Sequence, residues 1–165
     1  MMRPMRLILW AIATLFLGWQ VVTGPALAIN VDQSYRTIKL NEAGDTTIIS
    51  NKQLENGKRV FNNTCSQCHM AGRTKTNPNV TLRLEDLEGA FPPRDNVAAL
   101  VDYINEPMTY DGEIDISDLH PSTKRADIWS EMRNYTPDDL KDAAGYILVQ
   151  PSLQGYMWGG GKTVN

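Results

Sequence analysis

Residues 65–69 read Cys65-Ser66-Gln67-Cys68-His69, and this short stretch decides what kind of protein the chain forms. Two thiols in a Cys-x-x-Cys spacing, followed directly by an imidazole, form the attachment pattern of a c-type haem. In that chemistry the sulfurs of Cys65 and Cys68 bond the haem vinyl groups, and His69 becomes the proximal ligand of the iron. The chain has 2 cysteines in all, so the motif predicts one covalently attached haem c.

Other interpretations of the two cysteines fit the rest of the chain less well. A structural zinc site needs about four ligands, whereas the chain holds only one histidine besides His69, with no further cysteine. A thioredoxin-type dithiol lies near a βαβ pattern, and no such pattern is visible in this sequence. The motif therefore favours haem attachment over a zinc site or a redox dithiol.

The first 28 residues have the features of a secretory signal peptide. Arg3 and Arg6 precede an apolar run over residues 7–22, and Ala26-Leu27-Ala28 is a small-x-small cleavage site. The run is shorter than the ~20 residues that a membrane span requires, although an uncleaved anchor stays an alternative. We expect a signal peptide over 1–28 and a mature domain over 29–165, exported to a bacterial periplasm or a thylakoid lumen.

The expected mature domain is acidic. The whole chain has 16 Lys and Arg against 19 Asp and Glu, and the segment 1–28 removes two arginines and no acid. An acidic chain without a basic cluster argues against nucleic acid and against anionic lipid surfaces as partners. The charge leaves a protein partner, or none.

Hydrophobic patterns predict a hairpin and two main helices. Residues 37–40 and 46–49 are β-branched runs around a turn, which predicts a small hairpin in an N-terminal extension over 29–50. Helices are expected over 52–63, capped by Ser50, and over 137–149, capped by Thr136 and ending before Pro151. Gly57 and Gly145 are expected to face each other where these two helices cross.

Shorter elements complete the predicted domain. Helical segments are expected over 82–87, over 96–105 with Asp95 as the cap, and over 123–133, whereas 110–121 is expected to be loop. The glycine-rich tail over 154–165 has no periodicity, which predicts a flexible segment unless a partner orders it. The whole pattern predicts a mainly α, class I cytochrome c-like fold with a small hairpin, in which the covalent haem supplies much of the core.

The sixth ligand of the iron has two candidates. Met132 precedes the last expected helix, where electron-carrying cytochromes c place a methionine. His120 is the only other histidine, and Pro121 holds its backbone extended in a loop. A methionine raises the reduction potential and a second imidazole lowers it. The residues alone leave both candidates open.

Sequence blocks along the whole mature chain resemble the cytochrome c-550 family, the extrinsic haem subunits of photosystem II. The most specific blocks are Tyr110-Asp111-Gly112, His120-Pro121 and the segment 158–162. Further similar blocks lie at 57–61, 65–69, 74–78, 92–96, 100–103, 109–113, 120–122 and 132–134. The resemblance implies axial ligation of the haem iron by both His69 and His120, with Cys65 and Cys68 as the thioether residues.

The resemblance also implies a function. We expect a low-potential cytochrome, not an enzyme, in the thylakoid lumen, peripheral to the membrane and not spanning it. It would bind the photosystem II core beside other extrinsic oxygen-evolving subunits and stabilise the manganese–calcium cluster by retaining calcium and chloride. The alternative is a diffusible lumenal or periplasmic electron carrier, steered by its negative charge toward a basic partner.

Overall fold

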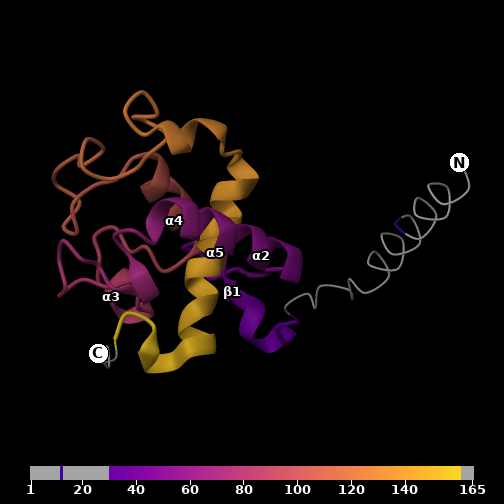
Figure 1. Cartoon of the computed structure of the whole chain (residues 1–165). Coiled ribbons are helices and arrows are strands. Elements are labelled where there is room, and N and C mark those ends of the chain that lie inside the picture. The colour runs from indigo at the N-terminus through magenta and orange to yellow at the C-terminus, as the bar shows by residue number, and fades with distance from the viewer. Residues whose placement is uncertain (1–11, 13–29, 161–165) are drawn as a thin grey trace, which may run out of the picture.

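A computed structural model describes residue 12 and residues 30–160 (Figure 1). Apart from Ile12, the predicted signal peptide over 1–28 lies outside the described residues, as do the last five residues of the tail. The described part is helix-rich and carries a two-stranded antiparallel sheet. Its main elements are β1 (Thr37–Lys39), β2 (Thr46–Ile48), α2 (Asn51–Val60), α3 (Leu84–Glu88), α4 (Val97–Asn105) and α5 (Pro137–Gln154). Of the described helices, none combines the length and the apolar character that crossing a membrane requires.

The predicted hairpin is confirmed. β1 pairs with β2 so that Ile38 lies opposite Thr47, and the buried Ile38 joins the hydrophobic core. Lys39 of β1 forms an ion pair of 2.7 Å with Asp95, which ties the hairpin to the start of α4.

The prediction that Asp95 caps α4 is wrong by one residue. Asn96 is the cap and accepts a hydrogen bond of 2.9 Å from the N–H of Ala99, because the Asp95 carboxylate is engaged by Lys39.

The crossing of α2 and α5 forms the centre of the molecule (Figure 1). A Cβ at Gly57 would lie 2.0 Å from the carbonyl oxygen of Asp142, so only glycine permits this close approach. The prediction of a close crossing at Gly57 is confirmed. The prediction that Gly145 is its counterpart is wrong: a Cβ at Gly145 would meet the Ile49 side chain at 2.8 Å instead. Gly145 makes room for the strand-to-helix connection, not for α2.

Both central helices begin where the sequence predicts. Ser50 and Gln53 form a capping box at the start of α2, and Thr136 and Asp139 form one at the start of α5. In each box the first side chain binds the backbone N–H of the third helical residue, at 3.2 Å in both helices. These bonds satisfy N–H groups that have no partner within the helix.

The predicted end of α5 is wrong. The helix continues through Pro151 to Gln154 and ends at Gly155, whose φ is +53°. Pro151 lies in the last turn, where its missing N–H leaves the carbonyl of Ile147 without its usual helical donor, yet the helix continues for three more residues. The N–H of Gly155 then donates to the carbonyl of Pro151 and closes the final turn.

The segment 123–133 does not form the predicted helix. It consists of turns followed by a 3₁₀ helix, Ser130–Asn134. Arg133 donates to the carbonyl oxygens of Ala126 and Asp127 at 2.6 and 2.9 Å, and the Trp129 indole donates to the carbonyl of Ser117 at 2.9 Å. The Arg133 side chain thus satisfies two carbonyl groups that a regular helix over 123–133 would pair internally, and Trp129 ties the segment to the preceding loop.

The tail up to residue 160 packs on its own domain, which corrects the prediction of a flexible segment. Trp158 is 2% exposed and its ring centre lies 5.6 Å from that of Phe61. The Trp158 indole N–H donates to the carbonyl of Leu82 at 2.8 Å. In Figure 1 the yellow tail turns back from the end of α5 toward α3.

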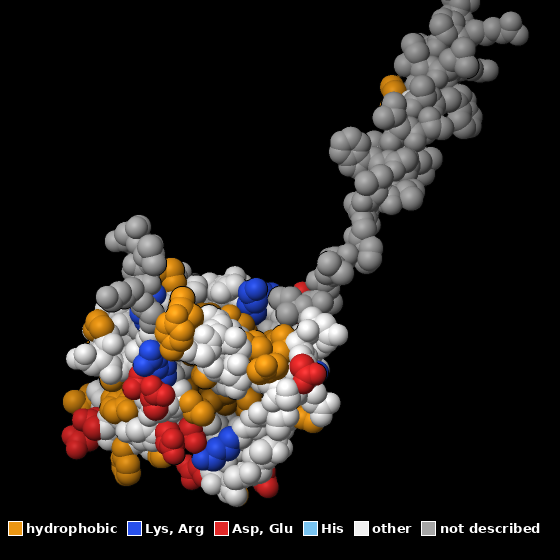
Figure 2. Space-filling model, turned by 90° about the horizontal axis from the view of Figure 1, so that it is seen from below, with side chains coloured by type: hydrophobic (Ala, Val, Ile, Leu, Met, Phe, Trp, Pro, Cys, Tyr) orange, Lys and Arg blue, Asp and Glu red, His pale blue; other side chains and the backbone are white. Residues whose placement is uncertain are grey.

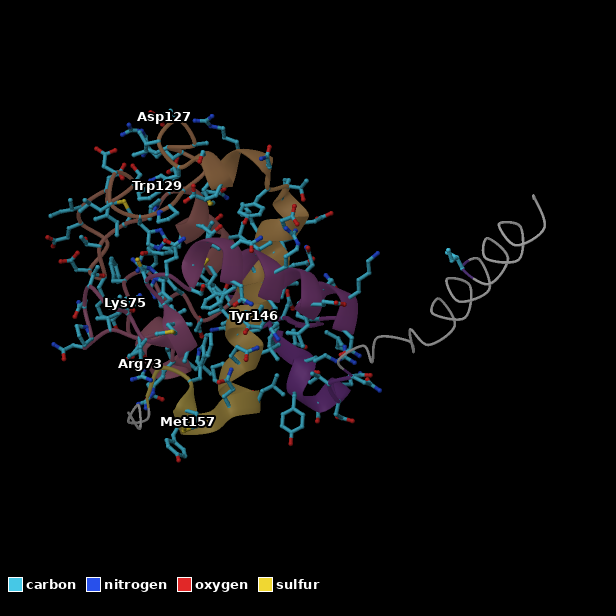
Figure 3. All side chains as sticks on the ribbon, in the orientation of Figure 1. Arg73, Lys75, Asp127, Trp129, Tyr146 and Met157 are labelled. Carbon is cyan, nitrogen blue, oxygen red and sulfur yellow. The ribbon has the colours of Figure 1, made fainter. Side chains whose placement is uncertain are left out.

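The surface near the tail carries hydrophobic, acidic and basic side chains side by side. Figure 3 places Tyr146 in the interior of the molecule, whereas Met157 lies at the outer end near the tail and is 49% exposed. Seen from below, the described surface intersperses hydrophobic side chains with acidic and basic ones (Figure 2). This face therefore presents no uniform charge.

Candidate haem site

The Cys-x-x-Cys-His motif begins where α2 changes its geometry. After Val60 the helix widens into a π-helical turn, Phe61–Cys65, in which the N–H of Ser66 donates to the carbonyl of Phe61 at 2.9 Å. The Cys65 carbonyl then accepts from the N–H groups of both Cys68 and His69, at 3.1 and 2.8 Å. This tight turn brings the two thiols and the imidazole together at the end of a helix that α5 holds in place. π-turns of this kind are frequent at functional sites.

The loop after His69 turns back through a residue with a positive φ angle. Ala71 has φ of +53°, a left-handed conformation that is uncommon for a residue with a Cβ. Its carbonyl accepts a hydrogen bond of 2.7 Å from the N–H of Gly159 in the tail. Gly72 follows, and a Cβ there would lie 2.7 Å from the Trp158 ring. The tail therefore packs directly on the residues that follow the predicted proximal ligand.

His120 lies in a loop on the other side of the site. Its backbone N–H donates to the carbonyl of Ile116 at 2.8 Å. Its ring nitrogen Nδ1 lies 3.0 Å from the carbonyl oxygen of Pro121, so Nδ1–H is the donor and Nε2 keeps its lone pair. On the opposite ring, Nδ1 of His69 lies 3.2 Å from the hydroxyl of Thr74. Hydrogen bonds of this kind to the second nitrogen orient imidazoles that bind metals.

The spacing of the two rings fits one iron atom. The ring centres of His69 and His120 lie 6.1 Å apart, with an angle of 56° between their planes. With a metal–imidazole bond of about 2.0 Å and about 1.1 Å from the nitrogen to the ring centre, two imidazoles on opposite sides of one metal have centres roughly 6 Å apart. The pair thus matches the distance that a haem iron between them would require.

The protonation of these groups also suits a haem. Burial lowers the pKa of His69, and burial together with the charges of His69 and Arg94 lowers the pKa of His120 to about 4. Both rings are therefore neutral near pH 7, as metal ligands must be. Cys65 and Cys68 form no disulfide, and burial raises the pKa of Cys65 to about 12.

The structure brings all four predicted site residues into one region and adds two that the sequence did not reveal. Tyr103 of α4 meets the His120 ring edge-on, with ring centres 5.0 Å apart. The Arg94 guanidinium lies over the Tyr103 ring, 4.1 Å from its centre. Both residues lie in blocks that resemble the cytochrome c-550 family, 92–96 and 100–103, but neither has a motif spacing from the histidines that would assign it to the site. The other candidate, Met132, is buried within Ser130–Asn134.

Comparison with known proteins gives a consistent result. The family profile described as "Cytochrome c-550 domain" matches residues 29–165. The chain is 55% identical to photosystem II extrinsic protein V from Picosynechococcus sp. over 153 residues, which cover 93% of this chain and 89% of that protein. It is 53% identical to the protein of the same name from Aphanothece halophytica, over 97% of this chain and 98% of that protein.

Two solved structures are similar in fold. Cytochrome c549 superimposes with a TM-score of 0.76 at 52% identity, covering 78% of this chain and 99% of the other. The PsbV2 cytochrome from Thermosynechococcus elongatus gives a TM-score of 0.63 at 35% identity, covering 74% and 87% of the two chains.

Proposed function

The chain belongs to the cytochrome c-550 family and carries a covalent haem c, and we propose that Cys65 and Cys68 form its thioether bonds while His69 and His120 are its axial ligands. The observation that carries this proposal is the pair of neutral imidazoles with ring centres 6.1 Å apart. Each ring has its Nδ1 atom within hydrogen-bond distance of an oxygen, at Thr74 or at Pro121, so Nε2 is the nitrogen available to a metal.

This ligand set determines what the chain can do with a haem. The haem supplies reversible one-electron chemistry when bound. His69 and His120 would hold the iron from both sides, which would leave no site on the iron for oxygen or peroxide and would favour a low potential. We therefore propose that the protein is not an enzyme.

We further propose that the protein is an extrinsic subunit on the lumenal side of photosystem II. The relatives that share 53–55% of its residues are named photosystem II extrinsic protein V, whereas identity to the PsbV2 cytochrome is 35%. The family profile begins at residue 29, directly after the predicted leader over 1–28, which supports export. In this role the protein would contact the photosystem II core and the other extrinsic subunits, and would help the manganese–calcium cluster retain calcium and chloride.

A release and reconstitution experiment tests this role. Photosystem II membranes from the source organism are washed with high salt, and oxygen evolution is measured with calcium and chloride withheld. We expect this protein in the wash and a loss of oxygen evolution, restored by adding back the purified protein. An unrelated small cytochrome c at the same concentration is the control and should restore nothing.

The alternative role makes the opposite prediction. A diffusible electron carrier would appear in the soluble fraction before the wash, and oxygen evolution would not depend on it. Such a result would contradict the subunit role while leaving the proposed haem ligation intact, because ligation is measured separately by spectroscopy.

A further inference from the structure

Arg94 is a buried cation that forms no ion pair with a described acidic side chain. Only 8% of its surface is exposed, and its Nη2 atom donates to the carbonyl oxygens of Met108 and Thr109 at 3.1 and 2.6 Å. No described Asp or Glu forms an ion pair with it, since the neighbouring Asp95 is paired with Lys39. Burial accordingly lowers the pKa of Arg94. Taking a charge out of water is costly, so a buried arginine needs a reason to be retained.

The surroundings of Arg94 connect it to the haem site. Its guanidinium carbon lies 4.1 Å from the centre of the Tyr103 ring, the geometry of a cation–π contact. The same ring meets His120 at an interplanar angle of 64°. Arg94, Tyr103 and His120 therefore form one contiguous stack, in which α4 supplies the middle member.

We propose that Arg94 tunes and positions the haem site: its positive charge favours ferrous iron, and together with Tyr103 it fixes the plane of the His120 ring. This inference rests on the proposed ligation of the iron by His120. A second imidazole ligand favours ferric iron and lowers the reduction potential. The positive charge of Arg94 acts in the opposite direction and raises the potential. The protein would thus hold a less negative potential than its two imidazoles alone would give.

The contact distances set the size of the effect. They place the guanidinium no more than about 9 Å from the His120 ring centre, hence within about 12 Å of an iron that this ring would bind. Coulomb's law at an effective dielectric constant of about 20 then gives an influence on the order of tenfold on a redox equilibrium. For a one-electron couple a tenfold change corresponds to ~59 mV.

The test compares the midpoint potentials of the holoprotein and three variants by spectroelectrochemical titration. Arg94→Gln removes the charge and should lower the ferrous-to-ferric ratio at a fixed potential about tenfold. Arg94→Lys keeps the charge and should lower the ratio less than about threefold. Lys52→Gln removes an exposed charge about 20 Å along the helix from Cys65 and should leave the ratio unchanged.

Tyr103→Leu gives a second, independent readout. This variant keeps the Arg94 charge but removes the ring between Arg94 and His120. The ferric electron spin resonance spectrum reports the relative orientation of the two imidazole planes, so its g-values should change while the midpoint potential moves less than in Arg94→Gln. This variant also keeps the proposal open to refutation if Arg94→Gln fails to fold.

The outcomes separate this inference from the proposed function. A wild-type spectrum without two-imidazole ligation overturns the proposed ligation, and the role of Arg94 with it. A two-imidazole spectrum combined with equal potentials in wild type and Arg94→Gln overturns the role of Arg94 alone. Unchanged g-values in Tyr103→Leu overturn the positioning part.

Discussion

Gly57→Ala tests whether the helix crossing at the centre of the fold depends on a missing side chain. An added Cβ would lie 2.0 Å from the carbonyl oxygen of Asp142 and 2.8 Å from the Cβ of Tyr146. These atoms belong to the backbone and to the first carbon of a side chain on α5, so rotamer changes cannot move them away. Relief requires α2 and α5 to separate by more than about 1 Å along their main contact, which disturbs the packed core on both sides.

The expected cost combines two opposing effects. Overpacking a core typically costs about 1–3 kcal/mol, and a clash with backbone belongs at the upper end of that range. Alanine in place of glycine in a helix returns about 1 kcal/mol. We therefore expect Gly57→Ala to lower the free energy of unfolding by about 2 kcal/mol, or by roughly 6–10 °C in Tm for a domain of this size.

Gly145→Ala is a matched control, because it makes the same change inside α5. Its added Cβ would meet the Ile49 side chain, at 2.8 Å from Cδ1 and 3.0 Å from Cγ1, with no backbone atom among the three nearest atoms. The strain should therefore be smaller than at Gly57, and the gain in helix propensity should offset more of it. Unfolding of both holoproteins is followed by circular dichroism during urea titration. Equal stabilities of Gly57→Ala and Gly145→Ala, or a stabilised Gly57→Ala, would refute the argument that the crossing requires glycine.

Two further changes test the tail and the start of α5. Trp158→Ala should lower the free energy of unfolding by about 3–5 kcal/mol, because it leaves a large cavity. Met157→Ala on the surface is the control and should change the free energy of unfolding by less than about 0.5 kcal/mol. Equal effects of the two variants in urea titration would mean that the tail does not belong to the core. The hydrogen bond from Asn56, followed by those from Thr136, lowers the pKa of Asp139. The Asp139 carboxylate therefore stabilises the folded protein fully above the unfolded-state pKa, and this stabilisation is lost as the pH falls through the lower folded-state pKa. Asp139→Asn should therefore cost about 1 kcal/mol at pH 7, and this cost should shrink as the pH falls through the lowered folded-state pKa of Asp139. A loss that keeps its full size at the acid end of the titration would contradict this explanation.

The sequence predicts the elements whose signals are local. Ser50 and Thr136 begin helices because each forms a capping box with a residue three positions later, and that spacing is visible in the sequence. The hairpin is equally local, since its β-branched runs flank a turn. Gly57 predicts a close helix crossing because a glycine within an otherwise regular helix needs a packing reason.

The features that sequence reasoning missed depend on contacts between distant residues. Asp95 does not cap α4 because Lys39, far away in the sequence, pairs with it. Trp158 lies in a glycine-rich segment that resembles a flexible tail, yet its ring packs on Phe61 and its indole reaches the Leu82 carbonyl.

The residues of the candidate site likewise fall into those that the sequence indicates and those that only the folded chain brings together. The Cys-x-x-Cys-His motif indicates the thiols and the first histidine directly. His120 is 51 residues further along the chain, so the residues alone could not separate it from Met132. Arg94 and Tyr103 lie in family-like blocks of the sequence, but their role beside His120 is visible only in the folded chain, which stacks the three side chains.

The central claim is that His69 and His120 hold the same iron, and ligand spectroscopy of the ferric holoprotein tests it most directly. Low-temperature electron spin resonance and the near-infrared spectrum are recorded for wild type, His120→Gln and Met132→Leu. The account predicts a low-spin, two-imidazole spectrum that is lost in His120→Gln and kept in Met132→Leu. A haem–methionine charge-transfer band in wild type that survives His120→Gln and disappears in Met132→Leu would contradict it.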